Sequence, residues 1–550
     1  MPMVEGGAAG RPNVLIVMTD QHRADLMTCA GNGVVPTPNI DRIAAEGVRF
    51  ENAYCPYPVC VASRMAMLSM RYAHTTGAVN NTDRLDWRYA TIAHHFGRHG
   101  YLPGLIGKMH FNDAHKHGFE YYLSINDWLM YLGPKVQHFA NEIASHPLSA
   151  HFFKTMIDDG AGMPDVADLW AGPSPWVGNV ERYDFREMAS QLEAEDHLDS
   201  FIARESVKFM QRYRDQPFFL VTSFMKPHTP FFAPKAWADL YPVDEMVLPE
   251  VGPVEGYPPH IRQRIAHHVA QDPRLRKAHL AGYLGNLAFA DTRVGVVLDG
   301  LEALGLAENT IVVYTSDHGE MAGDHGLFQK FCLFEPSVKV PLIVRAPGEM
   351  PRGVVAEALT ELIGLGPTLS DLAGLPAPSA APLVDTLDVP AELDGRSFAD
   401  VVRQPAVPVT DAAFSEYALR SGVPQTIVRT ARYKYVYNEG SVSELYDLQD
   451  DPGETVNRSR DAGLAKVEAE LRARLFAWFD PGENRWRAEG EGRDLGPQAA
   501  APGTSSRPGR TTVCIELLGH ISTLCWMSVF TSRMPSTVSG ISLFARSRKP

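Results

Sequence analysis

Cysteine is scarce in this sequence, which excludes folds held together by disulfides or structural zinc. Only six cysteines, at positions 29, 55, 60, 332, 514 and 525, occur in 550 residues. Their spacing is too irregular for a disulfide scaffold, and no Cys-x-x-Cys pair provides a zinc pattern. We therefore expect reduced thiols and a cytoplasmic location.

Long apolar runs and an excess of positive charge are also missing. The first apolar run, residues 14–18, is too short for the core of a secretory signal. The stretch 513–530 contains Glu516 and His520 among other polar residues, so no membrane association is expected. The formal net charge of −14 argues against a nucleic-acid partner. It leaves room for a small anionic ligand in a local positive pocket.

The length exceeds the size at which one hydrophobic core stops growing, so two domains are expected. Short, nearly continuous apolar runs are typical of parallel strands that are covered on both faces. Helix-like segments accompany them, and this alternation predicts an α/β fold with a mainly parallel sheet flanked by helices. The strand candidates are 13–20, 217–224 and 310–320, and the helix candidates are 37–48, 205–216 and 287–305.

The C-terminal part differs in composition and in its pattern of predicted strands and helices. A Pro- and Ala-rich stretch at 374–395 reads as a linker or long loop. Strand-like segments and a helix near 461–478 follow it and predict a small α+β domain. We expect a catalytic α/β domain over 12–380, the α+β domain over 395–485, and a disordered or non-native tail over 490–550.

Four polar residues stand where the first and third predicted strands end. Asp20 and Gln21 end one strand, and Asp317 and His318 follow another. Ligands of such sheets bind beyond the carboxyl ends of the strands, and these donors suit a divalent cation. Taken alone, Asp317 and His318 could equally be a helix cap and a solvated histidine. Nearby glycines and Lys330 favour the cation site.

Cationic and donor side chains gather around the same predicted edge. Lys108 and His110 are at alternate positions, so in an extended segment both would face one pocket, although an exposed loop pair is an equal alternative. His228 follows the predicted strand 217–224, where a lone histidine is more often structural. Together with Lys330 and Arg64, these groups would suit a tetrahedral oxyanion ester. This set of residues lacks a nucleophile.

Cys60 is the remaining candidate, in the segment "CVASR" with Ala62 and Arg64. Three interpretations are open from the residues alone: a buried structural thiol, a metal or redox cysteine, or the precursor of a nucleophile.

Several separated motifs, taken in order, resemble the sulfatase family of the alkaline phosphatase superfamily. They are "TDQHRAD", "TPNIDRIAAEGVRFENAYC", "CVASR", "GKMHF", "KPHTPF" and "SDHGEMAGDHG" with its following Lys330. The resemblance runs from about residue 13 to about residue 480, and it implies an alkaline-phosphatase-like fold.

The resemblance also implies roles for individual residues. A maturation enzyme would oxidise Cys60 to formylglycine, whose hydrate attacks sulfur or phosphorus through one hydroxyl. Arg64 would hold the hydrate, and Lys108 and Lys330 would bind the free oxygens of a small anionic ester. His110 would take the proton of the second hydroxyl, and His228 would protonate the leaving alkoxide. One divalent cation would be bound by Asp20, Gln21, residue 60, Asp317 and His318.

Three departures from the commonest sulfatase pattern bear on the substrate and the metal. Ala62 replaces a usual proline, while Gln21 and His318 resemble the phosphonate monoester hydrolase and phosphodiesterase branch and some alkyl sulfatases. This donor set makes manganese as plausible as calcium. The first expectation is hydrolysis of aryl or alkyl sulfate monoesters; the second is hydrolysis of phosphonate monoesters or phosphodiesters; the third is a metal-binding pseudoenzyme with unmodified Cys60. A homo-oligomer is left open.

Overall fold

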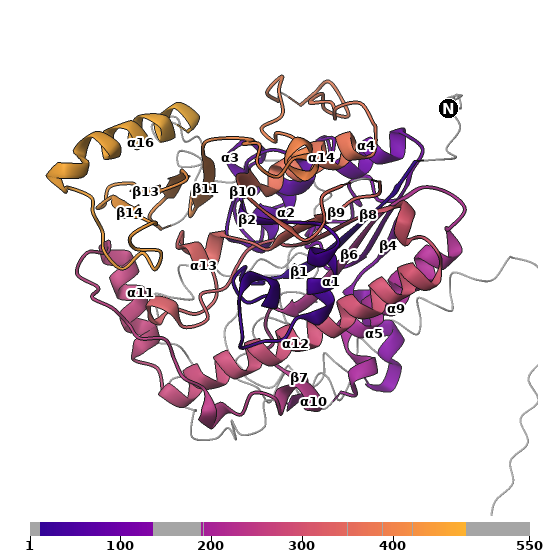
Figure 1. Cartoon of the computed structure of the whole chain (residues 1–550), viewed down its shortest axis with the longest axis horizontal. Coiled ribbons are helices and arrows are strands. Elements are labelled where there is room, and N and C mark those ends of the chain that lie inside the picture. The colour runs from indigo at the N-terminus through magenta and orange to yellow at the C-terminus, as the bar shows by residue number, and fades with distance from the viewer. Residues whose placement is uncertain are drawn as a thin grey trace, which may run out of the picture. The chain divides into compact units, whose positions relative to one another are not determined.

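The predicted apolar runs form the centre of a large mixed sheet. The computed structural model describes residues 11–135 and 189–479, apart from positions 191, 349, 388 and 421. Eight strands lie in the order β10-β2-β9-β8-β1-β6-β3-β4 (Figure 1). Their bounds are β1 Asn13–Asp20, β2 Val48–Tyr54, β3 Leu102–Gly107, β4 Tyr121–Leu123, β6 Phe218–Pro227, β8 Thr310–Ser316, β9 Leu342–Arg345 and β10 Val354–Glu361.

Most of the sheet is parallel, as the continuous apolar runs predict. β1 pairs in parallel with β6 and β8, and β3 pairs in parallel with β6 and β4. β9 alone runs against its neighbours β8 and β2, while β10 and β2 are parallel. The carboxyl ends of β8, β1, β6 and β3 therefore meet along one edge.

Apolar side chains of β1 fill the core on both faces of this sheet. Val14, Ile16 and Met18 belong to one buried cluster, and Leu15 and Val17 belong to another. Burying a side chain of this size contributes about 1.5–3 kcal/mol, so both clusters stabilise the sheet.

Helices cover both faces of the sheet (Figure 1). The helix predicted near 37–48 is α1. The helix predicted at 205–216 is α9, which begins earlier, at Leu198, and ends at Arg212. The helix predicted at 287–305 begins much earlier, at Pro273. Pro273 is the first residue of that helix, and the side chain of Asp272 caps it by accepting from the Arg274 N–H. In the described part of the first 380 residues, the helices are α1 Pro38–Ala45, α2 Cys60–Ser69, α3 Ala73–Thr76, α4 Ile92–Arg98, α5 Ile125–Leu132, α9 Leu198–Arg212, α10 Lys235–Ala238, α11 Pro259–Val269, α12 Pro273–Ala303, α13 Glu335–Val338 and α14 Leu365–Leu372. A small parallel pair is formed by β5 Ala189–Ser190 and β7 Ala233–Pro234.

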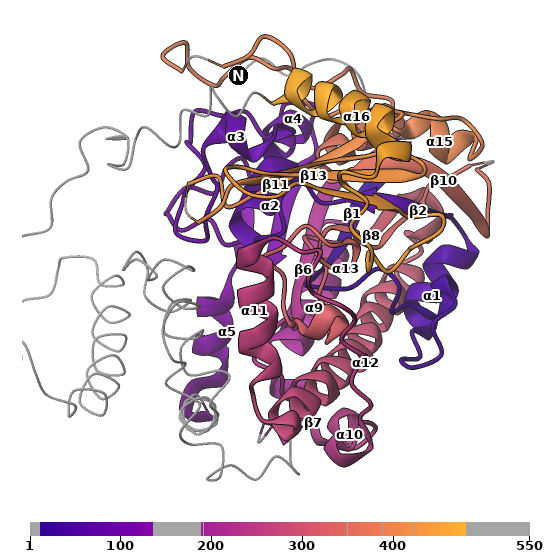
Figure 2. The same ribbon diagram turned by 90° about the vertical axis from the view of Figure 1, so that its left-hand side faces the viewer.

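A smaller antiparallel sheet forms the C-terminal part, as predicted. Its order is β11-β12-β13-β14, and the long helix α16 packs on one face (Figure 2). The elements are α15 Ala399–Arg403, β11 Ala413–Tyr417, β12 Gln425–Arg429, β13 Tyr433–Asn438, β14 Glu444–Asp447 and α16 Ala465–Trp478. All described residues belong to one compact unit, so the predicted boundary between 380 and 395 stays a prediction. The predicted tail, 490–550, lies outside the described residues.

A buried ion-pair network joins the two sheets. The ammonium of Lys434 on β13 lies 2.6 Å from a carboxylate oxygen of Glu454 and 3.2 Å from one of Glu335. The hydroxyl of Tyr54, at the end of β2, donates to the other oxygen of Glu335 at 2.8 Å. Lys434 is fully buried, so its ammonium is stabilised by the carboxylates of Glu335 and Glu454 in place of water.

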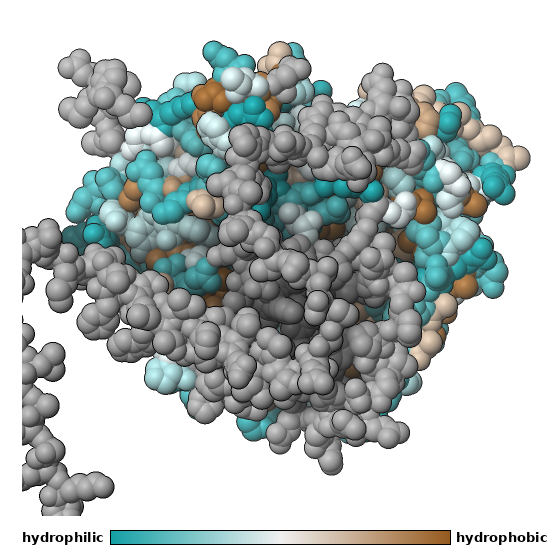
Figure 3. All heavy atoms as spheres, turned by 180° about the vertical axis from the view of Figure 1, so that it is seen from behind, coloured by the Kyte–Doolittle hydropathy of each residue, from teal (hydrophilic) through white to brown (hydrophobic). Residues whose placement is uncertain are grey.

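The described part of the face in Figure 3 is of ordinary polarity. Hydrophobic residues lie scattered among hydrophilic ones over the coloured part of the face in Figure 3. Among the described residues, every helix is too short or too polar to cross a bilayer.

Candidate active site

The ends of four neighbouring strands bring the predicted polar residues to one place. β1 ends at Asp20, β8 is followed by Asp317 and His318, β3 is followed by Lys108, and β6 is followed by His228. These residues are buried, as is Cys60. The convergence predicted from the sequence is therefore present in the structure.

Arg64 binds the two carboxylates at the centre. Its Nε donates to Oδ2 of Asp317 at 2.7 Å, and its Nη2 donates to Oδ2 of Asp20 at 2.9 Å. Lys108 Nζ also lies 2.6 Å from Oδ2 of Asp20. Oδ2 of each carboxylate is thus paired with a cationic side chain. Oδ1 of each carboxylate lies within 4 Å of Nε2 of His318.

Cys60 is the first residue of α2, a helix in which every residue is buried. Its Sγ lies 3.3 Å from Nε2 of His318, 3.8 Å from Oδ1 of Asp20 and 3.6 Å from Nζ of Lys108. Burial alone raises the pKa of this thiol, but Lys108, Lys330 and His318 outweigh it and bring the pKa well below its ordinary value. Position 60 therefore favours a negatively charged group.

Four side chains could hold a cation together. One ligand atom from each of Asp20, Cys60, Asp317 and His318 lies within 4.8 Å of the other three. Nδ1 of His318 donates to the carbonyl of Gly319 at 3.0 Å, which directs Nε2 toward the other ligands. Burial lowers the pKa of His318, but the charges of Asp317 and Cys60 raise it above its ordinary value. The negative groups that favour a proton on His318 would also favour a metal cation beside it. The four side chains therefore fit a cation site.

Gln21, also predicted as a metal ligand, takes part in a hydrogen-bond chain beside this group. Its Nε2 donates to Glu320, and its Oε1 accepts from Nζ of Lys330 at 2.5 Å. Lys330 also lies 2.8 Å from Nε2 of His228. Metal ligation by Gln21 stays a prediction.

His228 is held in one orientation. Its Nδ1 lies 2.8 Å from the carbonyl of Thr229, so Nδ1 donates and Nε2 accepts from Lys330. Burial, reinforced by Lys330 and Lys108, lowers the pKa of His228 to about 3. The imidazole of His228 is thus neutral near pH 7 when no anionic ester is bound.

Lys108 and His110 reach the same site, but not as alternate residues of an extended strand. β3 ends at Gly107, and His110 lies in the left-handed region with φ 67°. Both side chains nevertheless contact Cys60. Lys108 Nζ lies within hydrogen-bond distance of the thiol. Burial lowers the pKa of His110, and a hydrogen bond with Cys60 partly offsets this effect.

The sequence reasoning missed two residues of the site. Ser223 Oγ accepts from Nη1 of Arg64 at 2.9 Å, and Glu320 fixes the amide of Gln21. Glu320 is 1% exposed. It lies within the glycine-rich motif "SDHGEMAGDHG", and a carboxylate in such a motif could have indicated a residue of the site.

Comparisons with known proteins agree with this geometry. Residues 12–375 match the family model described as Sulfatase, and residues 323–479 match the model for the C-terminal region of N-sulphoglucosamine sulphohydrolase. The chain is 28% identical over 459 residues to an arylsulfatase of Clostridium perfringens, covering 81% of this chain and 90% of the relative. It is 29% identical over 478 residues to a choline-sulfatase of Rhizobium meliloti, covering 84% and 85%.

A solved phosphonate monoester hydrolase of Agrobacterium radiobacter has a similar fold. The two structures align with a TM-score of 0.67 and 23% identity over 85% of this chain and 95% of the other. The similarity supports the alkaline-phosphatase-like architecture predicted above.

Proposed function

The chain belongs to the sulfatase family, and we propose that it hydrolyses aryl or alkyl sulfate monoesters with a formylglycine hydrate made from Cys60. The observation that carries this proposal is the position of Cys60. Its thiol stands at the start of α2, among the side chains of Lys108, His318 and Asp20.

The surrounding charges suit an anionic tetrahedral ester. Lys108 and Lys330 are the groups we propose for its free oxygens, because both lower the pKa of the thiol that occupies this region. Arg64, fixed by Asp20 and Asp317, would hold residue 60 in place. A divalent cation held by Asp20, Asp317, His318 and residue 60 would neutralise further negative charge; calcium and manganese both fit this donor set.

The reaction needs three proton transfers. One hydroxyl of the hydrate first loses its proton to solvent, because position 60 favours a negative charge. The resulting alkoxide forms a bond to sulfur while the bond from sulfur to the alcohol oxygen breaks, and His228 gives the alcohol oxygen a proton. His110 then takes the proton of the second hydroxyl. The carbon–oxygen bond to sulfate breaks, and the aldehyde returns. The negative charge of a bound ester would raise the pKa of His228, so that its imidazole can carry the proton that the leaving oxygen takes.

A phosphonate monoester or phosphodiester hydrolase is the second candidate. Gln21 and His318 favour it because they match that branch of the superfamily, and a solved phosphonate monoester hydrolase is among the structural neighbours. The same lysines and cation site would recognise either tetrahedral centre, so some activity toward both classes is expected.

Two measurements test the proposal in order. The mass of the proteolytic peptide that contains Cys60, from protein made with a formylglycine-generating maturation enzyme, shows whether the thiol has become an aldehyde. Intact cysteine would remove this mechanism and favour the metal-binding pseudoenzyme. Matched aryl sulfate, phosphodiester and phosphonate substrates then rank the first two candidates, and faster turnover of a phosphorus ester would reverse their order.

A further inference from the structure

The backbone around Lys330 is held in an unusual conformation. Gln329 and Phe331, on either side of it, have φ angles of 63° and 73°. Residues other than glycine adopt this left-handed region only where their surroundings hold them there. The loop that presents Lys330 to the site therefore needs support from other parts of the chain.

Arg264 on α11 supplies contacts to this loop. Its Nη1 donates to the carbonyl of Phe331 at 2.7 Å, and its Nη2 donates to the carbonyls of Phe328, at 3.2 Å, and Lys330. One planar guanidinium thus joins three carbonyls, that of Lys330 itself and one on each side of it. Glu320 also contacts this loop, because its carboxylate accepts from the backbone N–H of Gln329.

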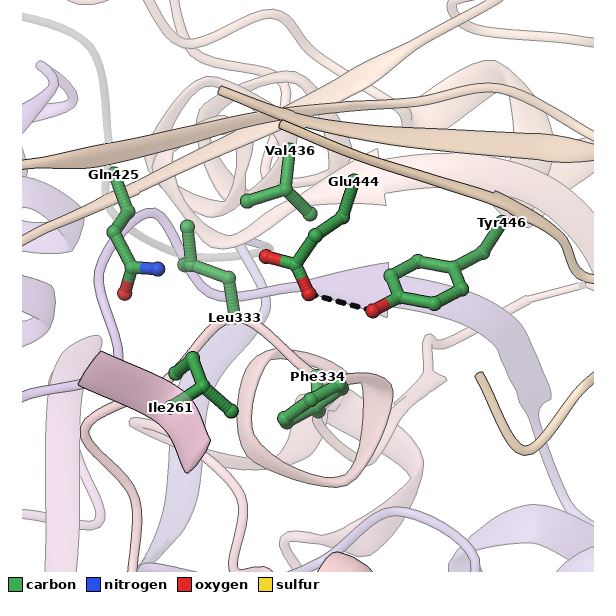
Figure 4. A pocket seen from close by; sticks show the side chains of 7 residues that line it. All are labelled: Ile261, Leu333, Phe334, Gln425, Val436, Glu444 and Tyr446. Carbon is green, nitrogen blue, oxygen red and sulfur yellow. Dashed lines mark hydrogen bonds between the residues drawn. The ribbon is translucent and has the colours of Figure 1, made fainter. Parts of the chain in front are cut away.

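α11 is in turn anchored to the C-terminal sheet. Ile261, one turn before Arg264, lines a small pocket with Val436 and Tyr446 of that sheet (Figure 4). His260 lies 3.0 Å from the side-chain amide of Gln425 on β12. The pocket itself offers no free carboxylate, because Glu444 already accepts from the hydroxyl of Tyr446 at 2.5 Å and from the amide of Asn438 at 2.9 Å.

From these contacts we propose that Arg264 is a positioning residue that holds Lys330 against Gln21 and His228. The C-terminal sheet thereby contributes to the site through α11, although none of its residues reaches the reacting atoms. The inference rests on the role proposed above for Lys330, and its first test requires no substrate.

Crystal structures of R264Q and R262Q provide that test. Arg262 is exposed on the same helix and serves as the matched control. We expect R262Q to keep Nζ of Lys330 in contact with Gln21 and His228. In R264Q it should move by roughly 1 Å or more, the scale of displacement that costs about 100-fold in rate. An unmoved Lys330 in R264Q overturns the inference whatever ester the protein hydrolyses.

A double-mutant cycle tests the consequence for turnover. We expect R264Q to lower kcat/KM by about 100-fold in the native background. In a K330A background the same change should cost no more than about twofold, because its effect acts through a side chain that is no longer there. An equal loss in both backgrounds would show that Arg264 acts in another way. If R264Q does not accumulate as folded protein, R264K is measured by the same crystal test, since its single ammonium cannot span three carbonyls.

Discussion

The sulfur of Cys60 lies 3.3 Å from Nε2 of His318, and both atoms belong to the group that could hold a cation. The nucleophile precursor and a metal ligand therefore share one small, buried space. Residue 60 would act both as the nucleophile and as a ligand of the cation. Its chemical modification should therefore also change the affinity for the cation.

Replacing Cys60 with alanine should abolish turnover and weaken cation binding. The change removes both the only proposed nucleophile and one of four clustered ligand atoms. Turnover of the preferred ester and calorimetric titration with calcium or manganese measure the two effects. C29A, at a half-buried cysteine outside the site, should leave both unchanged. Turnover by C60A at the native rate would contradict the proposed nucleophile.

Replacing Asp317 with asparagine should lower cation affinity by more than about 100-fold, beyond the loss typical of an outer-shell partner. The amide keeps the shape of the side chain but removes the charge that Arg64 and the cation share. Titration of chelator-treated protein with each metal measures this without a substrate. D299N, an exposed carboxylate on α12 that pairs with Arg42, is the control. Equal affinities in D317N and native protein would place the cation elsewhere.

Replacing Lys434 with methionine should destabilise the protein by about 3–5 kcal/mol, because the carboxylate of Glu454 would remain buried without its cation, and Glu335 would be left with the more distant guanidinium of Arg429 at 3.8 Å. Urea unfolding followed by circular dichroism gives the difference. K466M, at an exposed lysine of α16, should change stability by less than about 0.5 kcal/mol. A similarly small change in K434M would mean that the network contributes little.

Glu361 should make stability fall as the pH rises. Burial raises its pKa to about 7 in the folded chain, while Tyr72 and the Phe414 N–H donate to its Oε1. The folded state therefore binds this proton more tightly than the unfolded state does. Stability is lost between about pH 4.5, the unfolded pKa, and about pH 7, by on the order of 1–3 kcal/mol.

The variant E361Q isolates this effect. Its neutral amide should flatten the dependence of Tm on pH over that interval, whereas E357Q, at an exposed position of the same strand, should retain the native profile. Parallel profiles for E361Q and native protein would show that Glu361 does not titrate as described.

The central strands and their polar ends could be predicted because both leave local patterns. Asp20 and Asp317 each follow a continuous apolar run, and parallel strands place such ends at one edge. The left-handed backbone of His110 could not be predicted, since no glycine marks it. Arg264 lies beyond local patterns for another reason: its partners are backbone carbonyls more than sixty positions away, which any residue type provides.

The start of α12 was missed although the sequence contained its signal. Asp272 and Pro273 form an ordinary helix start, but the first half of the helix has little amphipathic pattern because it is buried on several sides. Burial of this kind depends on the neighbours that the fold supplies.

The ion pairs of Lys434 also have a consequence in time. Lys434 lacks the carboxylate of Glu454 until residue 454 has been synthesised, which takes roughly 20 to 80 seconds after residue 60 at ordinary rates of translation. Cys60 is only 1% exposed in the finished fold. The surroundings of this thiol are also completed late in synthesis, because His318, whose Nε2 lies 3.3 Å from its sulfur, is 258 positions further along the chain.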